Sequence, residues 1–144
     1  MLNKGKKDTM TISVLDQICN HLQVLGYKTS TKVVQDDTVI MATHHHGRHF
    51  ALRKVNDGLL FTTIFHSNGF AEKNREGYLN FINAMNQDVT VARIYTDYDA
   101  DLMFEAWLPY KYEEAGFNKF LELWNYDTVE QLLEKALEAK KYLI

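Results

Sequence analysis

Hydrophobic residues recur about every 3.6 positions in four segments of the chain, a period typical of helices that bury one face. A first helix is predicted over residues 11–25, and a second begins at residue 78. A third covers residues 113–124, and a fourth ends near residue 141. The apolar positions of these four helices are, in order, Leu15, Ile18, Leu22 and Leu25; Tyr78, Phe81, Ile82 and Met85; Phe117, Phe120, Leu121 and Trp124; and Val129, Leu132, Leu133, Ala136 and Leu137.

Turn and capping residues predict where these helices begin and end. Gly26 favours a helix end after the first apolar stripe. Asp127, followed three residues later by Glu130, resembles a capping box, so the last helix is predicted to start anew after an interruption at residues 125–126. Residues 68–75 open with Asn-Gly and are predicted to form a connecting loop.

Period-two alternation predicts four short strands between the first two helices, at residues 28–35, 38–44, 48–55 and 59–67. Turn residues separate them, and the Asp-Gly of the third turn favours the positive backbone angles of a type I′ hairpin. We therefore expect an antiparallel sheet with one half-buried face. The positions expected to alternate into that face include Phe50, Leu52, Leu60, Thr62 and Ile64.

The alternation returns at residues 89–96 and 102–108, on either side of an acidic turn. Arg93 and Glu105 lie about equally far from that turn, which predicts a cross-strand ion pair. The complete order is α-ββββ-α-ββ-α(α), which indicates a single α+β domain over residues 11–144, with the C-terminal helices on one face of an antiparallel sheet. Residues 1–10 are basic and predicted to be a disordered tail.

The segment from residue 78 to residue 109 carries a family resemblance. It contains LN-x-IN-A-x-N, then a strand with an arginine, an acidic turn and an apolar strand that ends in Leu-Pro. The matching residues are Leu79, Asn80, Ile82, Asn83, Ala84, Arg93, Asp99, Asp101, Leu108 and Pro109. This pattern resembles the bacterial YbjN-type family, whose members are often called sensory transduction regulators. The resemblance implies a fold similar to type III secretion chaperones, and it carries over no catalytic residue.

Charge and hydropathy exclude several classes of protein. A net charge of −3 and a pI of about 6.0 give no electrostatic footprint for nucleic acid. No segment approaches the roughly 20 apolar residues of a membrane helix, and the N-terminus lacks the apolar run of a signal peptide. We therefore expect a cytoplasmic protein with no membrane contact. Cys19 is the single cysteine of the sequence, so an internal disulfide is excluded. It is expected to be a buried, unreactive thiol.

Histidine is concentrated near the second turn, and neutral imidazole is a common zinc ligand. The candidate metal ligands are His44, His46, His49 and His66. In an extended strand His44 and His46 point to one side and His45 to the other, so the local sequence provides at most two ligands on one face. The alternative is a solvated turn without a metal. We expect no metal or other cofactor, and no role for zinc in folding.

Motifs for other chemistry are incomplete. Asp97, Asp99 and Asp101 begin like a calcium-binding loop, but its sixth and twelfth positions are Leu102 and Leu108, which cannot bind calcium through their side chains. The sequence contains no nucleophile elbow, phosphate loop or dinucleotide-binding fingerprint. We expect no enzymatic activity. An uncatalogued enzyme, whose residues meet only in the fold, is an alternative.

The leading prediction is non-catalytic protein binding, of a chaperone-like or regulatory-adaptor kind. A sheet covered by helices on one face leaves its other face available to a partner. The candidate contact residues are Asn80, Asn83, Met103 and Trp107. Apolar groups on both faces of the last hairpin also predict a homodimer. Two alternatives stay open. In the first, Asn80, Asn83 and Asn86, which lie three residues apart on one flank of their helix, bond to nearby backbone. In the second, the chain is a small-molecule or metal sensor that uses the histidine turn.

Overall fold

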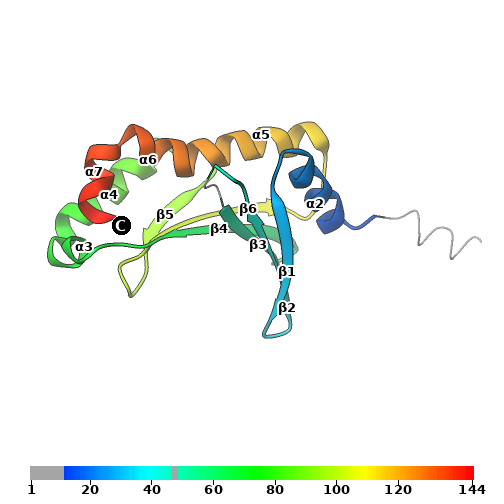
Figure 1. Ribbon diagram of the computed structural model, residues 1–144, viewed down its shortest axis with the longest axis horizontal. Coiled ribbons are helices and arrows are strands. Elements are labelled where there is room, and N and C mark those ends of the chain that lie inside the picture. Colours follow the sequence, from blue (N-terminus) through cyan, green and yellow to red (C-terminus); the bar gives the residue numbers. More distant parts are fainter. Residues whose placement is uncertain (1–11, 47–48) are drawn as a thin grey trace, which may run out of the picture.

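The computed structural model describes residues 12–46 and 49–144, so the predicted tail at residues 1–10 lies outside them. Six strands form one antiparallel sheet in the order β1-β2-β3-β4-β6-β5 (Figure 1). The strands are β1 (Lys28–Val34), β2 (Asp37–Thr43), β3 (His49–Val55), β4 (Gly58–Phe65), β5 (Arg93–Thr96) and β6 (Leu102–Pro109). The helices are α2 (Val14–Val24), α3 (Gly69–Lys73), α4 (Arg75–Asn86), α5 (Glu114–Asn125), α6 (Gln131–Glu134) and α7 (Ala136–Tyr142), with a π-helical turn η1 (Tyr126–Glu130) between α5 and α6.

The predicted α+β class and the order of its main elements are confirmed, with one helix added. Residues 68–75 were predicted to be a loop, but most of them form α3. The side chain of Asn68 accepts hydrogen bonds from the backbone N–H groups of Phe70 and Ala71, and so caps the start of that helix. The Asn-Gly pair therefore starts a helix here instead of forming a turn.

The core lies between the sheet and a layer formed mainly by α4, α5, α6 and α7, which are seen above the sheet in Figure 1. Phe61 of β4 packs against α5 in this core. Its ring lies 4.8 Å from that of Phe120 and 5.9 Å from that of Trp124, both on α5. No helix of the described residues covers the other face of the sheet (Figure 1).

The set of β4 side chains predicted to face the core is wrong, because it is shifted by one residue along the strand. Leu59, Phe61 and Thr63 are buried on the helical side, whereas Leu60, Thr62 and Ile64 alternate onto the other face. The cause is the hairpin turn. Asn56 and Asp57 both have positive φ angles, 51° and 59°, and this two-residue turn pairs Leu52 with Phe61. A shift of one residue reverses the face of every side chain in a strand.

Strand β5 is shorter than the predicted strand at residues 89–96, because a buried carboxylate binds the residues before it. Both oxygens of Asp127 accept a hydrogen bond from Thr90 N–H at 3.0 Å. One of these oxygens also accepts from Val91 N–H at 2.7 Å and from Ala92 N–H at 2.8 Å. Residues 90–92 therefore donate to a side chain instead of to a neighbouring strand, and pairing with β6 begins only at Arg93.

The predicted helix interruption and capping box are also wrong. The backbone continues from α5 through η1 into α6, and the Asp127 side chain caps no helix, because it is fully buried against residues 90–92. The η1 segment is a single π-helical turn with i→i+5 hydrogen bonds, a form found mostly inside longer helices. Here it also contains Thr128, whose hydroxyl donates to the Trp124 carbonyl oxygen at 2.8 Å.

The substitution Asp127→Asn should lower the free energy of unfolding by about 2–4 kcal/mol, because it removes a buried charge that three N–H groups share and adds a competing donor. Urea denaturation followed by circular dichroism measures the change. Asp88→Asn is the matched control. Asp88 is half-exposed, pairs with Lys135, and should change stability by less than about 1 kcal/mol. Equal effects of the two substitutions would contradict a special role for Asp127.

Candidate functional site

The sheet face without helices, called the open face below, presents apolar and aromatic side chains from three adjacent strands. Cross-strand pairing aligns Leu60 with Trp107, Ile64 with Met103, and Tyr95 with Met103. Trp107 is 47% exposed, Ile64 43% and Tyr95 37%, whereas Met103 is half-buried. Such side chains are unusual on a surface that nothing covers, so the open face is the candidate site.

A charged group lies at the centre of the open face. Glu105 is only 9% exposed, and its two oxygens have different partners. One accepts from the Nε of Arg93 at 3.0 Å and from its terminal nitrogen at 2.5 Å. The other accepts from the Tyr95 hydroxyl at 2.8 Å. The predicted Arg93–Glu105 pair is therefore confirmed, and the sequence reasoning missed the contribution of Tyr95.

This arrangement shifts the acid–base behaviour of both partners. Burial, and then the hydrogen bond to Glu105, raise the pKa of the Tyr95 hydroxyl. The hydrogen bond to Glu105 and its charge raise the pKa of the Arg93 guanidinium. Tyr95 stays protonated and Arg93 stays charged near neutral pH, so the three side chains form a fixed polar group in an apolar surface.

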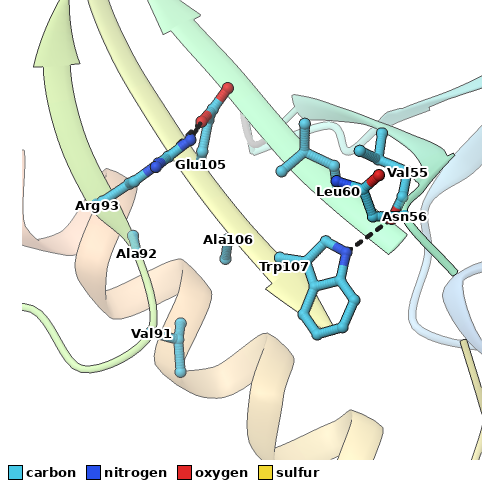
Figure 2. Close-up of a pocket in the computed structure, with 9 residues that line it drawn as sticks. All are labelled: Val55, Asn56, Leu60, Val91, Ala92, Arg93, Glu105, Ala106 and Trp107. Atoms are coloured by element: carbon cyan, nitrogen blue, oxygen red, sulfur yellow. Dashed lines mark hydrogen bonds and ion pairs between the residues drawn. The ribbon is translucent and has the colours of Figure 1, made fainter. Parts of the chain in front are cut away.

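Trp107 borders a pocket beside this polar group (Figure 2). The pocket has a volume of about 370 Å³, and its lining includes Val55, Leu60, Val91, Arg93 and Trp107. The indole N–H donates to the Val55 carbonyl oxygen at 2.8 Å. A Cβ atom at Gly58 would come within 2.2 Å of the indole ring, which therefore lies directly over this glycine. Trp107 is exposed but held in one orientation.

The four predicted contact residues do not lie together. Met103 and Trp107 are on the open face, whereas Asn80 and Asn83 are exposed on α4, in the helical layer. Asn86 shows what an asparagine of this helix does when it faces the sheet. Its amide donates to the Ile94 carbonyl oxygen at 2.8 Å and accepts from Ile94 N–H at 2.9 Å. Asn86 thus fits the alternative of hydrogen bonding to nearby backbone.

Two exposed members of the open face, Ile64 and Tyr95, were not among the predicted contact residues. Ile64 was assigned to the half-buried face through the shift of one residue in β4. Counting outward from the two-residue Asn56-Asp57 turn gives the correct pairing of Leu52 with Phe61, and alternation then places Ile64 on the open face. The separate pairing of β4 with β6 sets Ile64 beside Met103. Tyr95 shares a face with Arg93 by simple alternation, so its position was available from the sequence.

The candidate metal ligands separate into three places. His44 and His46 stack with His45 in the turn after β2, where ring centroids lie 4.0–5.1 Å apart. His49 begins β3 and lies 6.4 Å from the Phe65 ring. His66 is 3.3 Å from Asp101. The prediction that His45 points away from the other two is wrong, because β2 ends at Thr43 and strand alternation no longer applies.

The acidic turn between β5 and β6 uses its carboxylates internally. One oxygen of Asp97 accepts from the N–H groups of Asp99 and Asp101 at 2.9 and 3.0 Å. Asp101 accepts from Ser67 N–H at 3.1 Å and pairs with His66. These contacts tie the turn to the end of β4.

Among residues 12–46 and 49–144, no helix has both the length and the apolar character required to cross a bilayer.

Comparisons with known proteins agree on one family. A family model described as "Putative bacterial sensory transduction regulator", named YbjN, matches residues 15–125. A solved structure titled "Crystal structure of YbjN, a putative transcription regulator from E. coli" is similar in fold, with a TM-score of 0.66 and 15% sequence identity. The similarity covers 93% of this chain and 99% of that one. The search of curated proteins gave no significant match.

Cys19 should react slowly with alkylating reagents at pH 8. Burial, and then the negative charge of Asp16, raise the pKa of its thiol, so the reactive thiolate is scarcer than in an unfolded chain. Removing the charge in Asp16→Asn should speed alkylation by iodoacetamide about twofold. Asp88→Asn makes the same charge change elsewhere and should have no effect. Equal rates in the folded and urea-unfolded protein would contradict the expectation.

Proposed function

This chain belongs to the YbjN family of bacterial regulators, and from that premise we propose that it is a non-catalytic regulatory protein that binds another protein through the open face of its sheet. The observation that carries the proposal is the uncovered group of apolar and aromatic side chains on β4, β5 and β6. Large exposed apolar patches on globular proteins usually mark contact sites.

The composition of the open face supports protein binding in particular. Tryptophan, tyrosine and arginine carry much of the binding energy in protein interfaces, and this face presents Trp107, Tyr95 and Arg93 together. Each is already held by a hydrogen bond, Trp107 to Val55 and the other two to Glu105. Binding to side chains that are fixed beforehand costs less conformational entropy.

The Glu105 carboxylate fixes the polar side chains of the open face. Both oxygens of Glu105 already accept hydrogen bonds, one from Arg93 and the other from Tyr95. The carboxylate therefore serves to position its two partners. The proposed function is in accord with a family that is described as regulatory.

A second copy of the chain is the first occupant that we propose for the open face. Two identical faces that meet about a two-fold axis cover each other, and such dimers are the commonest protein assemblies. The apolar positions Ile64 and Trp107 would be buried, while Arg93, which is 76% exposed, would lie near acidic or carbonyl groups of the partner. A regulatory client would compete for the same surface.

Sedimentation equilibrium tests the dimer. The natural chain should exceed its mass of 16.8 kDa as its concentration rises, and Ile64→Lys should remain at 16.8 kDa because it places a charge in the apolar contact. Leu137→Lys is the matched control, since Leu137 is 84% exposed on α7 in the helical layer. The Leu137→Lys variant should dimerise as the natural chain does. A natural chain at 16.8 kDa at every micromolar concentration would refute the homodimer.

A different measurement tests binding to a client. A protein that copurifies from the native host is itself purified and titrated into this chain, while the two indole N–H signals of Trp107 and Trp124 are followed by NMR. Trp124 is buried in the core, so only the Trp107 signal should shift at first contact. Ile64→Lys should weaken the affinity at least tenfold. If the variant binds as tightly as the natural chain, the client uses another surface.

A further inference from the structure

Three consecutive histidines form a compact cluster in the turn after β2. His44 is half-buried, and His45 and His46 are exposed. Each offers a ring nitrogen, and these nitrogens lie within 4.8 Å of one another. The rings are stacked, with interplanar angles of 23° between His44 and His45 and 25° between His44 and His46. The cluster shares no residue with the open face.

His44 is the fixed member of the cluster. Its Nδ1 accepts a hydrogen bond from the backbone N–H of His46 at 3.2 Å, so this nitrogen faces the turn. Its Nε2 lies beside Gly26, where an added Cβ would be 3.2 Å away. The ring also packs edge-on against Tyr27, with centroids 5.0 Å apart. The Nδ1 side of His44 is therefore the side that a ligand shared with His45 and His46 would approach.

We propose that His44, His45 and His46 form a surface site for one divalent transition-metal ion of the zinc, nickel and copper class. A tetrahedral metal with bonds of about 2.0–2.1 Å holds its ligand nitrogens about 3.3 Å apart. Rotation of the two exposed side chains brings the nitrogens from their present spacing to that distance. The metal replaces the His46 amide proton as the partner of His44 Nδ1.

The ligand set determines which ions bind. Three neutral imidazoles without a carboxylate favour copper, nickel and zinc, whereas magnesium and calcium require oxygen ligands. Three protein ligands also leave at least one coordination position for water or a small molecule. His45 and His46 are exposed, so the open position is accessible from solvent.

The site is placed for reversible binding. It lies in an exposed turn, outside the core that joins the sheet to the helices. The bound metal therefore adds a contact to a fold that is complete without it. The proposal departs from the expectation that the chain binds no metal, and it assigns the metal no role in folding. It gives the family's regulatory function an input that is separate from protein binding.

The test uses the natural chain without a polyhistidine tag. Isothermal titration with zinc and with nickel should show one ion per chain, and magnesium should give no binding. The double substitution His45→Ala/His46→Ala should weaken zinc binding at least tenfold. Both side chains are exposed, so the variant should fold. His66→Ala is the matched control, because His66 is an exposed histidine that pairs with Asp101 outside the cluster.

Three results would overturn the proposal: no saturable binding of zinc or nickel, equal affinity in the double variant, or a comparable loss in His66→Ala. A chelator control separates a surface site from a structural one. Removal of metal should leave the circular dichroism spectrum unchanged, since structural zinc sites contribute directly to folding. Unfolding of the natural chain by chelator would contradict the reversible surface site.

Discussion

The buried carboxylate of Asp127 is the contact on which the rest of the arrangement depends. It joins the C-terminal helices to the segment before β5 through the N–H groups of Thr90, Val91 and Ala92. Because these groups donate to Asp127, the chain at residues 90–92 cannot continue the ladder with β6. The sheet edge therefore ends at Arg93, and the pocket beside Trp107 opens where the next strand pairs would lie. One interior charge thus shapes an exterior surface.

Two surfaces of different chemistry result from this fold. The open face is broad and apolar and has an internally neutralised polar centre, which suits a protein partner. The histidine cluster is small, polar and formed by one turn, which suits an ion. The cluster follows β2, and the open face lies on β4, β5 and β6, so β3 separates the two in the strand order.

The sequence predicted the fold where local signals agree, and failed where a distant residue decides the outcome. Turn residues and alternation located all six strands, and equal spacing from the acidic turn identified the Arg93–Glu105 pair. The spacing of Asp127 and Glu130 looked like a helix cap, because a local pattern cannot reveal that Asp127 binds backbone 35–37 residues away. The direction of His45 failed for a related reason: alternation holds only inside a strand, and the strand ends at Thr43. Whether the candidate site binds anything depends on partners that a single sequence does not contain.

The contact between Trp107 and Gly58 restricts which residues can occupy these two positions. No side chain fits at position 58 while the indole lies over it, since even a methyl group would overlap the ring. Loss of the indole would leave the Val55 carbonyl without this donor. In evolutionary terms the two positions form a coupled pair: relatives that keep tryptophan at 107 should keep glycine at 58, and a larger residue at 58 should appear only alongside a smaller one at 107.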